Sequence, residues 1–119
     1  MSFEPCAILL VEDEFLIAMD LQMQIEAAGY KVKGPAASVE AGMSILDDGP
    51  VCCAILDMNI RGSTSFPIAE RLAEEGTPFI FLSGNDAYRL LDQFAGHTVL
   101  TKPINYPELL AKVKEICGF

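Results

Sequence analysis

Short apolar runs alternate with longer amphipathic stretches along the chain. The runs at residues 6–11, 51–56 and 79–82 are continuously apolar, as is typical of strands covered on both faces of a sheet. Two weaker runs of the same kind lie at residues 30–33 and 98–100. The pattern therefore predicts five strands.

An amphipathic stretch follows each of these strands and predicts a helix. In the first, roughly residues 14–28, Phe15, Met19 and Met23 recur at helical spacing, and Gly29 is placed to end the helix. A second helix is expected at residues 38–46, with Ser38 as its cap, and a third ends at Glu75, with Pro67 in its first turn. A short fourth helix is expected at residues 86–94. The last helix runs to Ile116, with Asn105 as its cap and Glu108 three residues further on.

Strand and helix thus alternate five times, with no linker between them. Such alternation predicts a parallel sheet with helices on both faces, and five units are too few for an eight-stranded barrel. The expected fold class is α/β, an open, doubly wound, three-layer αβα sandwich. The 119 residues fit one domain, residues 1–119.

The charge of the chain narrows its possible partners. Eight Lys and Arg residues against 17 Asp and Glu residues give a net charge of −9, which argues against binding to nucleic acid or to an anionic membrane surface. The first residues are acidic and lack the basic start of a signal peptide, and no apolar run reaches membrane-spanning length. We expect a cytoplasmic protein.

The four cysteines do not form a recognisable metal-binding pattern. Cys6, Cys52, Cys53 and Cys117 include no C-x-x-C pair, and His97 is the single histidine of the chain. Since most of the cysteines lie in apolar runs, we expect buried, reduced thiols.

Polar residues stand where the predicted strands end. Glu12 and Asp13 follow the first strand, Asp57 follows the third, Ser83 the fourth and Lys102 the fifth. Ligand sites in open α/β sheets lie beyond the carboxyl ends of the strands, so these five side chains are expected to share one crevice. Taken singly, each has an ordinary alternative as a helix cap, a turn residue or a surface charge.

The residue types in this set suit phosphoryl chemistry. Three carboxylates repel one another unless a cation is present, and an oxygen-only set suits Mg²⁺. Asp57 can act as a carboxylate nucleophile that forms an acyl phosphate, while Ser83 and Lys102 can bind phosphoryl oxygens.

Four motifs give the chain a family resemblance. They are LLVEDE at residues 9–14, AILDMN at 54–59, LSG at 82–84 and TKP at 101–103. Together they resemble the receiver domain of two-component response regulators, and the match covers essentially the whole chain. The resemblance implies a flavodoxin-like fold with strand order 2-1-3-4-5.

The resemblance also implies roles for individual residues. Asp57 would accept a phosphoryl group from a phosphohistidine of a sensor histidine kinase or phosphotransfer protein. Glu12, Asp13, Asp57 and the backbone carbonyl of Asn59 would hold Mg²⁺, and Ser83 and Lys102 would bind the phosphoryl oxygens. The bond before Pro103 would be cis, and the site would slowly remove its own phosphate.

The sequence departs from the family pattern at several positions. Val99 stands where receivers commonly have the aromatic residue that reports phosphorylation, and Ser65 replaces a common glycine. Ile60 and Arg61 replace a common Met-Pro pair, and Arg61 is either a solvated loop charge or a second cation over the phosphoryl site. The fourth strand resembles that of stand-alone proteobacterial receivers with a Phe-Ala-Thr-Gly motif.

A single-domain response regulator is the leading hypothesis. It would be a monomer or weak homodimer that signals to an unknown protein target, or relays phosphate, by protein–protein contact. The alternatives are a receiver excised from a larger kinase or regulator, a Mg²⁺-dependent phosphohydrolase with Asp57 as nucleophile, and a flavin carrier. Asn59 stands where one phosphohydrolase class needs a second aspartate, and the acids of residues 12–14 would repel a flavin phosphate.

Overall fold

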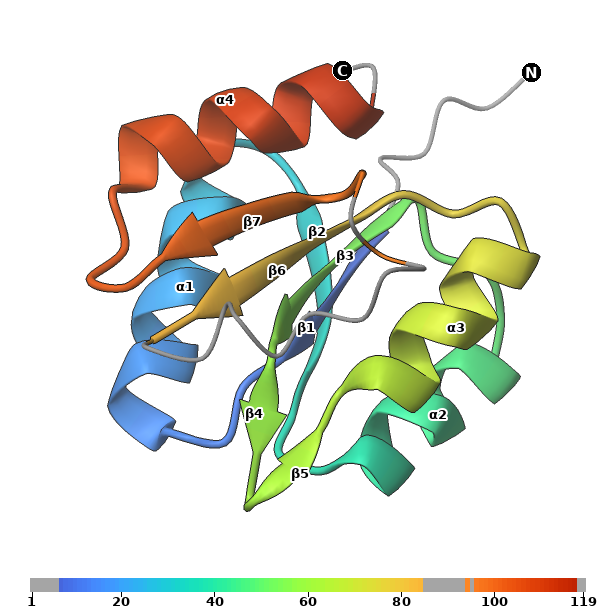
Figure 1. Cartoon of the computed structure of the whole chain (residues 1–119). Helices are drawn as coiled ribbons and strands as arrows, with labels where there is room; N and C mark the ends of the chain where they lie inside the picture. Colours follow the sequence, from blue (N-terminus) through green and yellow to red (C-terminus); the bar gives the residue numbers. More distant parts are fainter. Residues whose placement is uncertain (1–6, 85–93, 95, 118–119) are drawn as a thin grey trace, which may run out of the picture.

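The computed structural model describes residues 7–84, 94 and 96–117. Its main sheet has five parallel strands in the order β2-β1-β3-β6-β7 (Figure 1). These strands are β1 (Ala7–Val11), β2 (Lys31–Ala36), β3 (Cys53–Asp57), β6 (Phe79–Ser83) and β7 (Thr98–Thr101). The predicted parallel sheet and its strand order are confirmed.

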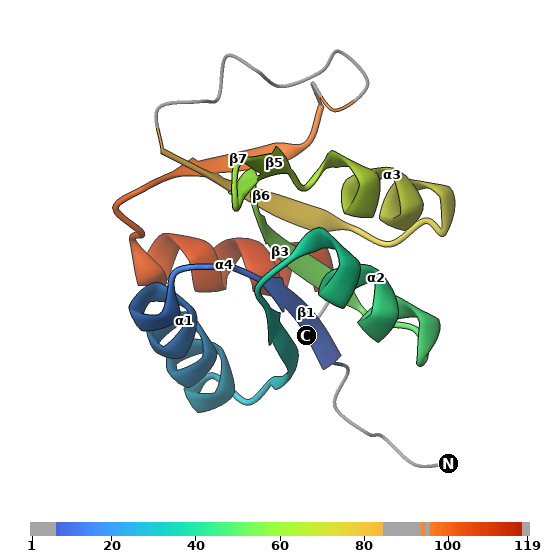
Figure 2. The same cartoon turned by 90° about the horizontal axis from the view of Figure 1, so that it is seen from below.

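The described helices form a layer on each side of this sheet. Helices α1 (Phe15–Ala27) and α4 (Tyr106–Cys117) cover one face, and α2 (Val39–Asp47) and α3 (Phe66–Glu74) cover the other (Figure 2). The three-layer αβα architecture is therefore confirmed. The helix predicted at residues 86–94 falls almost entirely outside the described residues.

Each central strand sends alternate side chains into the two layers. Leu9 and Val11 of β1 pack in a cluster with residues of α2 and α3, whereas Ile8 and Leu10 pack with residues of α1 and α4. This is the consequence of a two-residue repeat in a strand that is buried on both faces. It also decides toward which layer the polar residues beyond each strand point.

Two of the predicted helix caps form hydrogen bonds in the structure. The Ala41 N–H donates to Ser38 Oγ at 3.1 Å, and the Glu108 N–H donates to Asn105 Oδ1 at 3.0 Å. Each bond satisfies a backbone donor that the first turn of a helix leaves without an intrahelical partner. The starts of α2 and α4 were thus correctly read from the sequence.

The apolar stripe noted on the first helix does not face the core. Phe15, Met19 and Met23 are exposed, whereas α1 is anchored by Ala18, Leu21 and Ile25. Because α1 carries apolar residues on both sides, their spacing alone does not decide which side is buried.

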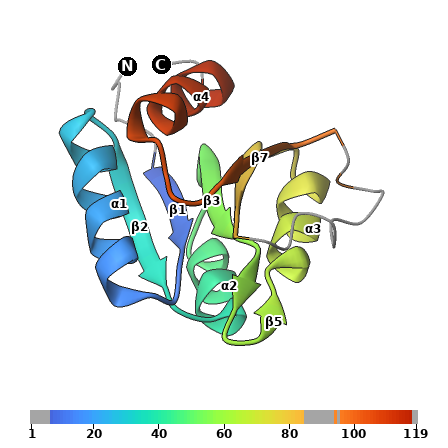
Figure 3. The same ribbon diagram turned by 60° about the vertical axis from the view of Figure 1, so that its left-hand side comes forward.

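Two segments that were expected to be loops contain strand structure. Strand β2 continues past Lys33 through Pro35 to Ala36, which an edge strand tolerates because one side of its backbone has no partner to bond. Residues 59–65, expected as a polar loop, contain a small antiparallel hairpin of β4 (Asn59–Ile60) and β5 (Ser63–Thr64) (Figure 3).

The cysteines differ in their oxidation state. Cys53 is buried with a free thiol, and Cys117 is half-buried with a free thiol, as expected for reduced cysteines. Cys52 is half-buried and disulfide-bonded, so the prediction of a buried reduced thiol was wrong for this residue. Its backbone N–H donates to the Ala7 carbonyl, which places it at the amino end of the central strands, just before β3 begins.

The helices described in the structure are too short or too polar for a membrane span.

Candidate functional site

The register of the central strands brings two acidic side chains together. Leu10 of β1 lies opposite Ile55 of β3, and two positions further along each strand come Glu12 and Asp57. Because side chains alternate along a strand, both acids follow the orientation of the apolar residues before them. Both are also buried, with Glu12 1% and Asp57 6% exposed. The two predicted carboxylates therefore share one pocket at the carboxyl end of the sheet.

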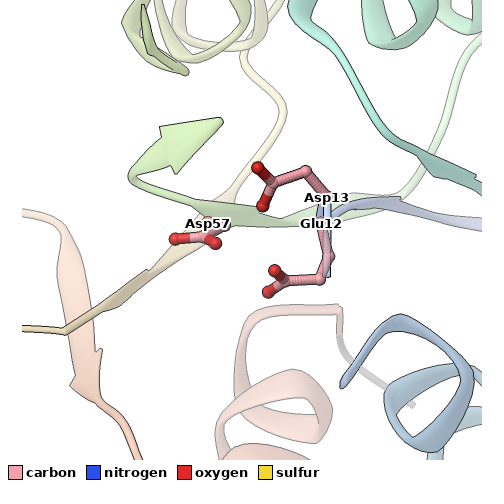
Figure 4. Close-up of side chains that lie close together, drawn as sticks. All are labelled: Glu12, Asp13 and Asp57. Atoms are coloured by element: carbon pink, nitrogen blue, oxygen red, sulfur yellow. The ribbon is translucent and has the colours of Figure 1, made fainter. Parts of the chain in front are cut away.

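Asp13 completes a cluster of three carboxylates. Glu12, Asp13 and Asp57 each offer one oxygen, and these oxygens lie within 4.8 Å of one another. The three side chains converge on the same space, with Asp57 reaching in from a different strand than the other two (Figure 4). The acids that the sequence predicted at two strand ends thus form one site.

Lys102 supplies the positive charge that contacts this cluster. Its Nζ donates to Asp57 Oδ2 at 3.0 Å and to Glu12 Oε2 at 3.2 Å. The backbone of Lys102 is also held in place, because its N–H donates to the Ser83 carbonyl. The Lys102–Pro103 peptide is cis, as predicted. Burial alone would lower the pKa of Lys102, but the bonds and charges of Asp57 and Glu12 outweigh it and raise that pKa.

Glu12 is the carboxyl group whose proton affinity the site changes most clearly. Burial, together with the hydrogen bond and the negative charge of Asp57, raises the pKa of Glu12 from 4.5 to about 7. The Glu14 backbone N–H and Lys102 act in the opposite direction but do not compensate. Without a further cation, the site is therefore short of positive charge at neutral pH.

This raised pKa predicts a pH-dependent stability. As pH rises from about 4.5 to 7, the unfolded chain releases the Glu12 proton while the folded chain keeps it, so the free energy of unfolding falls. With allowance for partial screening, the loss is at most about 3 kcal/mol. Glutamine at position 12 cannot titrate, so Glu12→Gln should not show this loss of stability. In EDTA, the free energy of unfolding of the variant, measured with urea, should therefore rise relative to that of wild type between pH 4.5 and 7.

Glu26→Gln on the exposed side of α1 is the matched control and should follow wild type at each pH. A constant difference between wild type and Glu12→Gln from pH 4 to 8 would show that Glu12 titrates normally.

The β4–β5 hairpin holds the third carboxylate. Its two-residue turn, Arg61–Gly62, has positive φ at both positions, 52° and 80°, as a type I′ turn requires. The turn presents the Arg61 N–H to Asp13 Oδ2 at 2.9 Å, while the Gly62 N–H bonds to Asn59 Oδ1 at 3.1 Å. Sequence reasoning missed this contact because arginine rarely adopts positive φ, although Gly62 indicated a turn.

Arg61 therefore contacts the acidic site through its backbone. Its side chain is exposed and lines a groove with Ser38 and Glu40 at the start of α2. A role of the Arg61 side chain as a second cation over the phosphoryl site stays a hypothesis.

The donor set fits a magnesium ion. It consists of carboxylate oxygens from two strand ends, with no nitrogen or sulfur ligand among the grouped residues. Burial and the hydrogen bond and negative charge of Asp57 raise the pKa of Glu12, although Lys102 contacts both carboxylates. A divalent ion would relieve the repulsion between them. Glu12, Asp13 and Asp57 are the residues placed to hold it.

The two remaining predicted site residues flank Asp57. Ser83 is fully buried and ends β6, next to Leu82, which lies opposite Asp57 in the sheet. The Asn59 N–H donates to Asp57 Oδ1 at 3.3 Å. The roles of the Ser83 hydroxyl and of the Asn59 carbonyl stay predictions.

An aromatic cluster fills the region beside the position of the absent switch residue. The rings of Phe66, Phe81 and Phe94 pack with centroid distances of 5.4–5.8 Å, and Val99 is partly buried against the same cluster. Phe94 is fully buried in this cluster, while Tyr88, Leu90 and Leu91 lie outside the described residues. His97 stacks on Phe79 at the entry to β7.

Comparison with known families identifies the family of the chain. The family model described as the response regulator receiver domain matches residues 8–114. The chain belongs to this receiver family. Receiver domains bind Mg²⁺ at an acidic pocket and interact with histidine kinases or phosphotransfer proteins. This receiver domain has an acidic cluster of Glu12, Asp13 and Asp57.

Individual relatives agree with this assignment. The receiver is 32% identical over 114 residues to the transcriptional regulatory protein YkoG of Bacillus subtilis and 31% identical over 113 residues to the regulatory protein VanR of Enterococcus faecium. Each alignment covers 90% of this chain but 49% and 48% of the relative. The chain therefore spans about half the length of these curated relatives.

Solved structures show the same fold. The solution structure of SdrG from Sphingomonas melonis Fr1 is 34% identical, with a TM-score of 0.81, and the alignment covers 97% of this chain and 98% of SdrG. A receiver domain from Methanospirillum hungatei superposes with a TM-score of 0.86 at 23% identity, covering 97% of this chain and 95% of that one.

Proposed function

We propose that this receiver is a Mg²⁺-dependent phosphorylation switch that accepts a phosphoryl group on Asp57. One observation carries the proposal. Asp57 is a buried carboxylate at the end of a central strand, bonded to Lys102 and clustered with two further acids. A buried acid with these partners suits a nucleophile better than a structural ion pair, which would not need three carboxylates.

The residues around Asp57 hold its carboxylate for attack. The Asn59 N–H and the Lys102 ammonium bond to different oxygens, Oδ1 and Oδ2, and so fix the plane of the carboxylate. One carboxylate oxygen attacks phosphorus, the bond from phosphorus to the donor histidine nitrogen breaks, and its electron pair returns to the imidazole. The positive charge of Lys102 remains beside the transferred group and can stabilise its oxygens.

Bound Mg²⁺ would neutralise charge on the phosphoryl oxygens. Glu12, Asp13 and Asp57 are the proposed ligands, with the Asn59 carbonyl as a further one. The Arg61 N–H keeps one oxygen of Asp13 engaged, so that the other is left for the ion. The hairpin thereby restricts the orientation of the outermost carboxylate.

Phosphorylation by a small donor tests the proposal. Wild type mixed with acetyl phosphate and Mg²⁺ should gain about 80 Da, one phosphoryl group, in an intact-mass measurement. The same mixture with EDTA should show no adduct, because the carboxylates then repel the incoming anion. Absence of the adduct in the Mg²⁺ sample would contradict the proposed function.

The proposed donor is a protein that carries a phosphohistidine, and the exposed side of α1 is the proposed docking surface. Phe15 and Leu16 are 73% and 79% exposed, and Met19 and Met23 are exposed on the same helix. Leu16 also lines a groove of about 380 Å³ that extends to Lys102. An apolar surface continuous with the reacting site suits an apolar face of the donor protein.

This surface should matter for a protein donor and not for a small one. We expect Leu16→Asp to slow transfer from a phosphorylated sensor kinase by about tenfold or more, because an anchor of an apolar contact is lost. Phosphorylation by acetyl phosphate should keep its wild-type rate. The measurement is a time course of labelled phosphate on the receiver.

Ala27→Asp at the exposed far end of α1 adds the same charge and serves as the control. Equal slowing with both donors would place the effect in the site and remove α1 from the docking surface.

We further propose that the chain acts as a single-domain regulator in the cytoplasm. The match to SdrG, which covers 98% of that chain, supports the single-domain part of this proposal. The regulators YkoG and VanR, in which the match covers about half the length, represent the alternative of a receiver that forms part of a longer protein. In either case the phosphorylated domain would pass its signal on by protein–protein contact.

A further inference from the structure

Two free thiols meet at the end of the sheet opposite to the acidic site. Cys53 is the first residue of β3, whose last residue is Asp57, and Cys117 is the last residue of α4. Cys53 is fully buried in the cluster between the sheet and the layer of α1 and α4, and Cys117 packs against that cluster from the surface. The pair thus links a central strand to the C-terminal helix.

The two thiols lie near each other. Cys117 packs against the buried cluster that contains Cys53, and the two thiols are near enough for each to change the pKa of the other. Two cysteines that pack together on neighbouring elements need little movement to reach the geometry of a disulfide. This contact serves neither the acidic site nor the proposed docking surface on α1.

The two sulfurs have different accessibility and chemistry. Interaction with Cys53 lowers the pKa of Cys117, whereas interaction with Cys117 and burial raise the pKa of Cys53. Cysteines that react with oxidants are accessible, have a lowered pKa and stand next to a second, resolving cysteine. Cys117 fits the role of the reactive cysteine, and Cys53 fits that of the resolving cysteine.

We propose that Cys53 and Cys117 form a reversible, peroxide-driven disulfide that fastens α4 to β3. The Cys117 thiolate attacks hydrogen peroxide, forming a sulfenic acid and releasing hydroxide. The Cys53 thiol then attacks the Cys117 sulfur, forms the S–S bond and releases water. In total, two thiols and one peroxide give one disulfide and two waters, and a dithiol reductant reverses the reaction.

The cross-link should stabilise the folded domain. It would close a long loop that includes most of the sheet, from the start of β3 to the end of α4. Closing such a loop lowers the entropy of the unfolded chain. We therefore expect the thermal midpoint to rise by about 5 °C or more on oxidation.

The test uses a Cys6→Ser/Cys52→Ser background, because Cys52 is itself disulfide-bonded in the structure. The reduced protein is treated with hydrogen peroxide, denatured and alkylated with N-ethylmaleimide. We expect a loss of about 2 Da, no alkylation, and full recovery of both thiols after dithiothreitol. Adding Cys117→Ser or Cys53→Ala should abolish the mass loss and the rise in thermal midpoint.

Two alkylated thiols after peroxide, oxygen adducts without a cross-link, or a disulfide between two chains would each overturn the proposal. If the background variant does not fold, wild type gives the same answer by non-reducing tryptic mapping. A peptide beginning at Glu115 should then be linked, after peroxide treatment, to the peptide of residues 34–61 that carries Cys53. Its absence would contradict the proposal. Neither readout depends on phosphorylation, so the outcome is independent of the proposed function.

Discussion

Asp57→Asn is expected to abolish phosphorylation. In acetyl phosphate and Mg²⁺ the variant should show no phosphoryl adduct by intact mass, because an amide oxygen is too weak a nucleophile to form the acyl phosphate. Its backbone setting should persist, since the Asn59 N–H can still bond to a side-chain oxygen. The expected effect is therefore chemical rather than structural.

The stability of this variant makes the prediction specific. Two of the causes that raise the pKa of Glu12 come from Asp57, so removing that charge relieves repulsion in the pocket. In EDTA at pH 7.5 we expect the free energy of unfolding of Asp57→Asn to equal or exceed that of wild type. The gain should be no more than about 1–2 kcal/mol.

Asp48→Asn, at the exposed end of α2, is the matched control and should be phosphorylated like wild type. A phosphoryl adduct on Asp57→Asn at the wild-type rate would exclude Asp57 as the acceptor.

Lys102→Met should impair both chemistry and stability. The substitution keeps the length of the side chain and removes the ammonium group that bonds to Asp57 and Glu12. Loss of a donor that faces developing charge lowers rates by about 100-fold to 1,000-fold, so we expect a loss in this range for phosphorylation by acetyl phosphate. The measurement is the initial rate of adduct formation.

The stability effect of Lys102→Met should be opposite in sign to that of Asp57→Asn. Without Lys102, Glu12 and Asp57 have no contacting cation among the described side chains, and breaking a buried pair from one side is costly. In EDTA at pH 7.5 we expect a loss of about 2–4 kcal/mol in the free energy of unfolding.

Lys112→Met on α4 removes a partly exposed lysine whose surface ion pair with Glu115 is weak, so it should change neither quantity appreciably. A wild-type phosphorylation rate in Lys102→Met would show that the lysine serves only the fold.

The position of the acidic site could be predicted from the sequence because it follows from the two-residue repeat of buried strands. Glu12 and Asp57 each come directly after an apolar run, and in a parallel sheet such ends meet at one edge. Lys102 could be placed in the same way. The N-caps of α2 and α4 could be predicted too, because Ser38 and Asn105 each accept a hydrogen bond from a backbone N–H only three residues away.

The features that were missed depend on contacts between distant segments. The Arg61 N–H reaches Asp13 through a turn that arginine disfavours, so local preference gave no indication of it. The apolar residues of α1 lie on both sides of the helix, so the spacing of Phe15 and Met19 could not show that they are exposed. The contact of Cys53 with Cys117 joins a strand start to a helix end and leaves no pattern in the sequence.

The most direct test of the central claim locates the phosphoryl group on the chain. Wild type phosphorylated by acetyl phosphate in Mg²⁺ is treated with borohydride, which reduces an aspartyl phosphate to homoserine, and the peptides are sequenced by mass spectrometry. We predict homoserine at position 57, with a loss of about 14 Da from the aspartate and no such change in a sample kept in EDTA. Reduction at another carboxylate, or an unreduced Asp57 in a phosphorylated sample, would contradict the account.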